Sequence, residues 1–154
     1  MDNQEIKAEI TRRLLATGRQ GIENTVKYLE ESDFFSTGCH THHRFRGGLA
    51  RHSLETCQYA LKHSHGLPAD SIILAALLHD TCSSHTRAAA HIPRHGLRSV
   101  RILHELCHLD LTPAEHDAIL HHMHHDADVM RTNPLARLIF RADKTSACGA
   151  VHLR

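Results

Sequence analysis

The stretch Ile72-Ile73-Leu74-Ala75-Ala76-Leu77-Leu78-His79-Asp80 decides how this chain folds, because seven apolar residues in a row end there in a histidine and a carboxylate. A run of this kind can form a buried helix or a buried strand. The two alanines and the helical patterns on either side favour a helix. Pro68-Ala69-Asp70-Ser71 stands before the run and is typical of a helix start. We therefore predict a buried helix with His79 and Asp80 at its end.

The sequence on both sides of this run also has helical spacing. Apolar residues recur every three or four positions in three segments, 6–17, 22–29 and 49–61. Thr112-Pro113-Ala114-Glu115 has the form of a capping box, and Asn133-Pro134 begins the last predicted helix. Two polar stretches, 32–48 and 81–94, lack such spacing and are expected to be loops. We predict an all-α fold, a single helical bundle of about six or seven helices.

Composition limits what the protein can be. With 154 residues, 41% of them apolar, the chain suits one compact domain over residues 1–154. The 18 basic and 17 acidic side chains give a net charge of +1, and only 4% of residues are aromatic, so nucleic acid is not an expected partner. No apolar run approaches the ~20 residues of a membrane span, and the polar start lacks a signal-peptide pattern. A cytoplasmic location is expected, with the five cysteines as reduced thiols.

Four side chains stand out among the many polar residues, namely His52, His79, Asp80 and Asp143. Each alone has an ordinary interpretation: His52 as a cap or core residue, Asp80 as an exposed residue past a helix end, Asp143 as part of a solvated face. Together they form a mixed nitrogen and oxygen set that suits a divalent metal such as Mn, Fe, Co, Ni, Zn or Mg. The lack of thiolates among them argues against a structural zinc site.

Three segments carry these residues: His42-His43-Arg44-Phe45-Arg46-Gly47-Gly48-Leu49-Ala50-Arg51-His52-Ser53, Leu77-Leu78-His79-Asp80 and Ala142-Asp143-Lys144-Thr145-Ser146-Ala147. In this order they resemble the signature of the HD-domain superfamily of metal-dependent phosphohydrolases, over roughly residues 39–147. The resemblance implies an HD-domain helical bundle. It also implies that His52, His79, Asp80 and Asp143 are primary metal ligands, with His79 and Asp80 as the catalytic pair.

Superfamily members that hold two ions add two further histidines. This chain offers His95, and it offers His122, which we prefer to His121 because its spacing from Ala118 and Ile119 places it on the less polar helix face. The alternative for both His95 and His122 is an ordinary histidine or one that contacts phosphate. The resemblance therefore implies one or two divalent ions.

The activity implied by the resemblance is hydrolysis of a small-molecule phosphate ester, above all a nucleotide, by metal-activated water. Candidate substrate-binding residues are Arg46, His43, Lys144 and Arg98, each of which could equally be a solvated surface residue. Many superfamily members follow His-Asp with a hydrophobic residue, Gly and Lys, whereas this chain has Thr81-Cys82-Ser83. A role for that lysine cannot be carried over. The sequence leaves the oligomeric state open.

Two other functions remain open at this stage. A few superfamily members are diiron oxygenases with a similar set of six ligands, and tight iron with substrate-dependent oxygen uptake would identify one. A module that binds a nucleotide without turning it over is the other alternative, and binding without hydrolysis would identify it.

Overall fold

The computed structural model describes residues 1–82 and 94–153. Every regular element in these ranges is a helix, which confirms the predicted all-α class. In chain order they are α1 Asn3–Ala16, α2 Ile22–Glu31, α3 Gly48–Lys62, α4 Ala69–Leu78, α5 His95–Arg101, the π-helical segment η2 Ile102–Leu106, α6 Pro113–Leu120, α7 Ala127–Thr132 and α8 Pro134–Ala147. The short α7 and the π-helical segment were not predicted. The predicted loop 81–94 lies largely outside the described residues.

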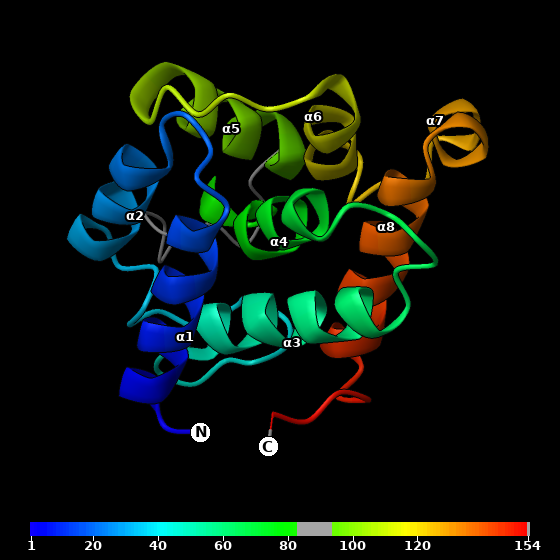
Figure 1. The fold of residues 1–154 in the computed structure, drawn as a ribbon. Coiled ribbons are helices and arrows are strands. Elements are labelled where there is room, and N and C mark those ends of the chain that lie inside the picture. Colours follow the sequence, from blue (N-terminus) through cyan, green and yellow to red (C-terminus); the bar gives the residue numbers. More distant parts are fainter. Residues whose placement is uncertain (83–93, 154) are drawn as a thin grey trace.

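The predicted apolar helix is α4, and it lies at the centre of the molecule (Figure 1). It packs against α1, α3, α6 and α8. Its buried side chains are Ile72, Leu74, Ala75, Ala76, Leu77 and Leu78. Because α4 is covered by four other helices, the groups at its carboxyl end, His79 and Asp80, lie inside the bundle.

The helix starts follow the local signals in the sequence. Thr112 and Glu115 form the predicted capping box at the start of α6, with Pro113 in the first turn. Asn133 caps α8 by accepting a hydrogen bond from the backbone N–H of Ala136. These caps satisfy backbone N–H groups that have no partner within the helix.

A buried ion pair ties the α1–α2 turn to the rest of the bundle. The guanidinium of Arg19 donates to both carboxylate oxygens of Glu115, at 2.6 and 2.9 Å. Glu115, on α6, is fully buried and also accepts from the hydroxyl of Ser71 on α4, at 2.7 Å. The carboxylate therefore joins three elements that are distant in the sequence.

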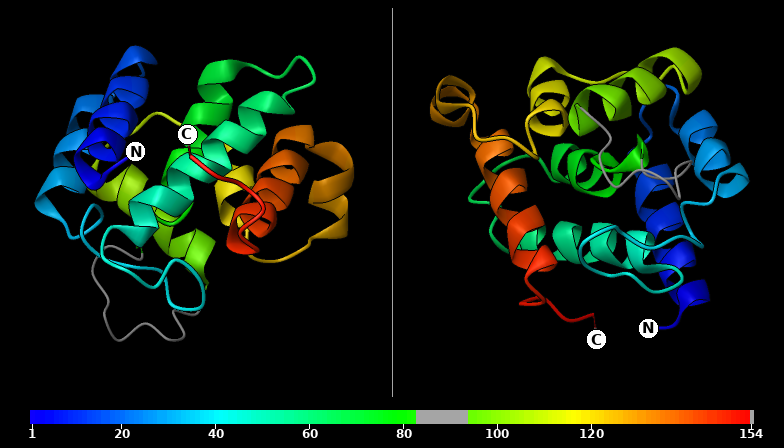
Figure 2. Two further views of the ribbon diagram at one scale, coloured as in Figure 1. Left: turned by 90° about the horizontal axis from the view of Figure 1, so that it is seen from below. Right: turned by 180° about the vertical axis from the view of Figure 1, so that it is seen from behind.

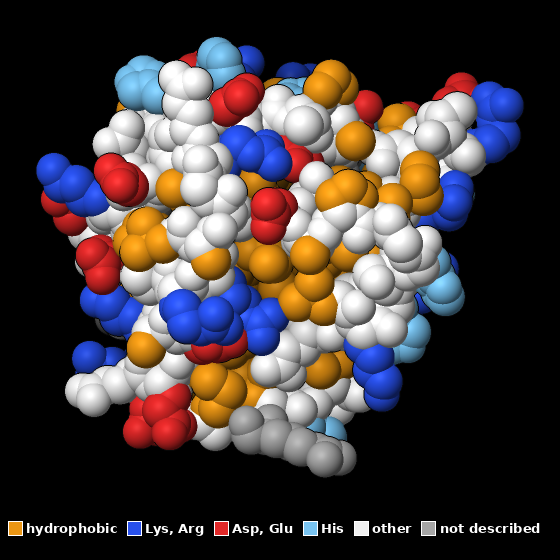
Figure 3. Space-filling model, in the orientation of Figure 1, with side chains coloured by type: hydrophobic (Ala, Val, Ile, Leu, Met, Phe, Trp, Pro, Cys, Tyr) orange, Lys and Arg blue, Asp and Glu red, His pale blue; other side chains and the backbone are white. Residues whose placement is uncertain are grey.

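The outer surface fits the near-neutral charge of the chain. On the face drawn in Figure 3, basic and acidic side chains are interspersed among apolar ones. The two ends of the chain lie at the same edge, and in the view from behind the segment 32–47 lies over the beginning of α3 (Figures 1 and 2). Within the described ranges, no helix has both the length and the apolar character needed to cross a membrane.

Candidate metal centre

The structure brings the six predicted ligand residues together from five helices. His52 lies on α3 and Asp143 on α8, while His79 and Asp80 follow the last residue of α4. His95 is the first residue of α5, and His122 comes two residues after α6. The side chains of His52, His79, His122, Asp80 and Asp143 are buried, and that of His95 is partly buried. Asp80 is only 7% exposed, so it is not the solvent-exposed residue past a helix end that its position alone allowed.

One half of the centre is formed by His52, His79 and Asp143. The Nε2 atoms of the two imidazoles lie 3.2 Å apart. They are 3.0 Å and 3.6 Å, respectively, from Oδ1 of Asp143. One nitrogen from each ring and one carboxylate oxygen thus face a common point, the arrangement that a single ion requires.

Asp80 joins this half to a second one. Its Oδ2 lies 3.4 Å from Nε2 of His79, whereas its Oδ1 lies 3.0 Å from Nδ1 of His95 and 3.1 Å from Nε2 of His122. The ring of the neighbouring His121 makes no hydrogen bond to this cluster. The carboxylate of Asp80 therefore has one oxygen on each half.

Backbone carbonyl groups at the ends of two helices orient the rings of His79 and His122. The Nδ1–H of His79 donates to the carbonyl of Ala76 at 2.8 Å, and the Nδ1–H of His122 donates to the carbonyl of Ile119 at 2.7 Å. The last carbonyls of a helix have no partner within it, so both acceptors are available at the ends of α4 and α6. With Nδ1 used in this way, each neutral ring presents the lone pair of Nε2 to the cluster.

Two glycines allow the backbone to approach closely beside the centre. A Cβ at Gly96, in the first turn of α5, would lie 2.1 Å from the carbonyl oxygen of Leu120 at the end of α6. A Cβ at Gly48, at the start of α3, would lie 1.8 Å from the carbonyl oxygen of His43. Glycine therefore permits the close contact between α5 and α6 that places His95 near His122.

The field inside the cluster is strongly negative. Burial disfavours the charged form of His79, but Asp80 and Asp143 outweigh it and raise the pKa of His79 to about 9. Burial likewise opposes ionisation of the two carboxyls, yet His79 and hydrogen bonds from neighbouring imidazoles keep the pKa of Asp80 and of Asp143 well below the usual value. Both carboxylates therefore stay ionised in the interior.

The pKa values of the other imidazoles shift in opposite directions, depending on whether burial or the neighbouring groups have the larger effect. Burial lowers the pKa of His52 in spite of its hydrogen bond to Asp143. For His95, burial opposes the charged form, but Asp80 and Cys82 together outweigh it and raise the pKa to about 10. For His42, in the segment beside His52, burial and the neighbouring histidines lower the pKa to about 4. The two histidines with a raised pKa, His79 and His95, thus both lie close to Asp80.

The donor set fits a divalent cation. The Nε2 atoms of His52 and His122 lie 3.0 and 3.1 Å from carboxylate oxygens, and that of His79 lies 3.4 Å from one. Neutral imidazole and carboxylate repel each other in this orientation unless a proton or a metal ion lies between them. Nitrogen and oxygen ligands without thiolate suit Mn, Fe, Co, Ni, Zn or Mg. The raised pKa of His79 measures the same attraction for positive charge.

The predicted substrate-binding residues divide into two pairs. Lys144 and His43 lie at the cluster: Nζ of Lys144 donates to Oδ2 of Asp143 at 3.0 Å, and the ring of His43 has its centroid 5.3 Å from that of His52. Arg46 and Arg98 are exposed, and their guanidinium groups make no hydrogen bond or ion pair with any described residue. A role of Arg46 and Arg98 in substrate binding therefore stays a prediction.

Three nearby residues were missed by the sequence reasoning. Glu55 and Ser146 are buried behind His52, and His42 has its ring centroid 4.5 Å from that of His52. His42, His43 and His52 form a further group of nitrogens close enough for one ion. Spacing was the available signal: Glu55 lies three residues after His52, and Ser146 lies three residues after Asp143, so each shares a helix face with a ligand.

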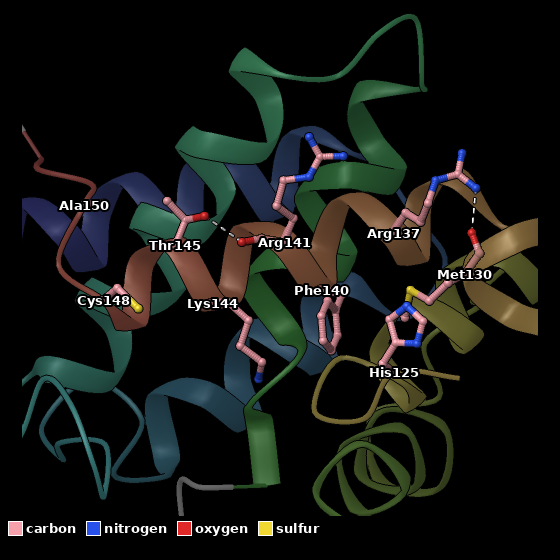
Figure 4. Close-up of a pocket in the computed structure, with 9 residues that line it drawn as sticks. All are labelled: His125, Met130, Arg137, Phe140, Arg141, Lys144, Thr145, Cys148 and Ala150. Carbon is pink, nitrogen blue, oxygen red and sulfur yellow. Dashed lines mark hydrogen bonds between the residues drawn. The ribbon is translucent and has the colours of Figure 1, made fainter. Parts of the chain in front are cut away.

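A pocket of about 610 Å³ lies along α8 (Figure 4). Phe140, Lys144 and His125 point to one side of the helix, whereas Arg137 and Arg141 point to the other. Four of the nine residues that line it are basic or histidine, and none is acidic. Lys144 belongs both to this pocket and to the centre through its contact with Asp143.

Comparison with known proteins agrees with this geometry. The model of the HD domain matches residues 49–148, about two thirds of the chain, and this range includes all six residues of the cluster. Searches of curated proteins and of solved structures gave no match. HD domains bind divalent metals and are in general metal-dependent phosphohydrolases, and the clustered His and Asp side chains are able to hold such an ion. The chain belongs to the HD-domain family.

Proposed function

We propose that this protein is a metal-dependent phosphohydrolase that acts on a nucleotide or another small phosphoester. The observation that carries the proposal is the convergence of three imidazole Nε2 atoms, on His52, His79 and His122, on the carboxylates of Asp80 and Asp143. All five side chains are buried inside a family whose members are in general enzymes of this kind.

The residues that would hold the metal form two sets, one on each half of the centre. His52, His79, Asp80 and Asp143 would hold one ion, and Asp80, His95 and His122 would contribute to a second. A divalent ion in this position lowers the pKa of a water molecule and withdraws charge from a phosphoryl oxygen, which prepares hydrolysis of the ester. Burial of the ligands keeps bulk water away from their lone pairs and strengthens each electrostatic contact.

Positive side chains on α8 support a phosphate-bearing substrate. Lys144 stands 3.0 Å from Asp143 with its side chain 45% exposed, so its ammonium can reach both the centre and an incoming phosphate. The pocket along α8 supplies Phe140 and further basic groups and has no acidic lining residue. A phosphate at Lys144 with an organic group against Phe140 is the chemistry of a nucleotide.

The proposal is tested with protein purified without a histidine tag. We expect elemental analysis to find one or two transition-metal ions per chain, and a phosphoester panel with Mn²⁺, Ni²⁺ or Mg²⁺ to release phosphate or a nucleoside. His79→Ala and Asp80→Ala should abolish both the bound metal and the turnover, because each removes a ligand atom from the cluster.

The chain offers a matched control in a second His-Asp dipeptide, His116-Asp117, which lies on the surface with side chains 47% and 44% exposed. His116→Ala and Asp117→Ala should change neither metal content nor turnover. Turnover that survives His79→Ala or Asp80→Ala would overturn the proposal. So would nucleotide binding without turnover, or substrate-dependent oxygen uptake by an iron-loaded protein.

A further inference from the structure

His52 is held from behind by two polar side chains that the proposed reaction does not use. Its Nδ1 lies 2.9 Å from the hydroxyl oxygen of Ser146, and this hydroxyl lies 3.1 Å from Oε2 of Glu55. His52 and Ser146 are fully buried, and Glu55 is 4% exposed. The three residues therefore form a continuous hydrogen-bonded chain between α3 and α8, inside the protein.

The direction of each hydrogen bond in this chain follows from its acceptors. A carboxylate oxygen only accepts, so the hydroxyl of Ser146 donates its single proton to Glu55. The other available acceptor, the carbonyl oxygen of His52, is farther from the hydroxyl, at 3.4 Å. The hydroxyl oxygen then accepts from Nδ1–H of His52. This leaves the lone pair of the imidazole on Nε2, which faces Asp143 at 3.0 Å.

The position of His52 explains why side chains are needed for this task. His79 and His122 follow the ends of α4 and α6 and donate Nδ1–H to carbonyls in the last turns of these helices. His52 lies within α3, where the carbonyl groups of the preceding turn are used by the helix itself. Ser146 supplies the acceptor that the backbone cannot, and Glu55 orients the hydroxyl of Ser146.

Glu55 also contacts the segment that precedes α3. Nε2 of His43 lies 2.9 Å from Oε2 of Glu55, the same oxygen that accepts from Ser146. His43 has a left-handed backbone conformation with φ 44°, which is uncommon for a residue with a side chain. A buried carboxylate thus connects the segment 32–47 to His52 and to α8.

We propose that Ser146 and Glu55 are positioning residues that hold His52 with its proton on Nδ1, so that Nε2 is available to a metal ion. This inference rests on the proposed function only in that it assumes a metal at the centre. A group that accepts a hydrogen bond from the other ring nitrogen of a metal-binding histidine fixes the orientation of the ring and determines which nitrogen carries the proton. Loss of such a group weakens metal affinity by about 10- to 100-fold. Ser146→Ala should produce a loss of this size, and Glu55→Gln a smaller one.

The test measures binding of Mn²⁺ or Zn²⁺ alone by calorimetry, on full-length protein stripped of metal. Ser146→Thr keeps a hydroxyl and should restore most of the affinity that Ser146→Ala loses. Thr56→Val is the matched control, because Thr56 is equally buried, follows Glu55 on α3 and its hydroxyl has no hydrogen-bond partner in the described part of the chain. Thermal unfolding of each metal-free variant, followed by circular dichroism, separates loss of affinity from loss of folding.

The outcomes separate this inference from the proposed function. Wild-type affinity in Ser146→Ala and Glu55→Gln, or an equal loss in Thr56→Val, would overturn the positioning role and leave the hydrolase proposal intact. Wild-type protein that binds the ion but hydrolyses no phosphoester would overturn the hydrolase proposal, while a selective loss of affinity in Ser146→Ala would still support the positioning role.

Discussion

Nζ of Lys144 lies 3.0 Å from Oδ2 of Asp143, although the two residues are neighbours in the sequence. Adjacent residues of a helix point about 100° apart, so the long lysine side chain must bend back to reach the carboxylate. Its ammonium also lies 5.3 Å from the centre of the Phe140 ring. Lys144 therefore stands between the buried carboxylate and the pocket on α8, where an incoming phosphate would meet it first.

Replacement of Lys144 should weaken substrate binding more than metal binding. We expect Lys144→Ala to raise KM about tenfold, which corresponds to about 1.4 kcal/mol, because a charged hydrogen bond to phosphate is lost. Metal content, measured by elemental analysis, should stay at the wild-type level. Arg131→Ala removes an exposed cation that pairs with Asp128, and it should leave KM unchanged. Equal effects of the two substitutions would show that Lys144 acts only through overall charge.

Substitution of Asp80 should remove more bound metal ions than substitution of His122. Asp80 has an oxygen on each half of the centre, whereas Nε2 of His122 contacts Oδ1 of Asp80, on the second half. If the wild-type chain binds two ions, Asp80→Ala should bind none tightly, and His122→Ala should keep one. Elemental analysis after dialysis measures both values. Loss of both ions in His122→Ala would mean that the two halves do not bind independently.

Removal of the metal should destabilise the folded protein. An ion that binds only the native state stabilises it by about 2.7 kcal/mol at a hundredfold excess over its dissociation constant. We therefore expect a chelator to lower the thermal midpoint of the wild-type protein, and added Mn²⁺ or Zn²⁺ to restore it. His79→Ala should show no such shift on addition of either metal. A midpoint that does not respond to chelator would contradict metal binding in the folded state.

The Arg19–Glu115 ion pair, which lies outside the metal centre, should make the stability of the folded protein depend on pH. Burial raises the pKa of Glu115, but the hydrogen bonds from Arg19 and Ser71 outweigh it and lower that pKa below its ordinary value of 4.5. The pair therefore contributes stability above about pH 4.5, and this contribution is lost as the pH falls through the lowered pKa of the folded state.

Arg19→Ala should lower the free energy of unfolding by about 3 kcal/mol at pH 7, because it leaves a buried carboxylate without its cation. The difference from wild type should shrink toward pH 4, where the unpaired Glu115 takes up a proton. Urea unfolding at both pH values measures this. Arg131→Ala, which removes an exposed ion pair with Asp128, serves as the control and should leave the unfolding curve unchanged. A penalty for Arg19→Ala that is independent of pH would contradict the argument.

The main helices could be predicted because local signals and burial agree in them. The apolar run 72–78 is buried as α4, and the Thr112–Glu115 box and Asn133-Pro134 begin α6 and α8 as expected. The π-helical segment 102–106 was not predicted, because such segments are rare and a run of five residues is too short to establish a period of its own. Helix α7 has only six residues, too few for a recognisable period.

The residues at the centre were predicted with uneven success, for a physical reason. Buried carboxylates such as Asp80 and Asp143 are conspicuous beside apolar runs, so the sequence could single them out. Glu55 and Ser146 act from behind a ligand, and only the packing of α3 against α8 shows that their side chains meet. Arg46 and Arg98 are close to motif residues in sequence, but their side chains are exposed, and their role in substrate binding stays a prediction.

The close approach at Gly96 has a consequence for anyone who wishes to rebuild this centre elsewhere. The first turn of α5 rests directly on the carbonyl groups at the end of α6, with no side chain between them. The separation of His95 and His122 is thus set by the main chain, and repacking of nearby side chains cannot adjust it. If the six ligand side chains are grafted onto another helical scaffold, the half of the centre that contains His95 and His122 will form only where two helix backbones of that scaffold come equally close.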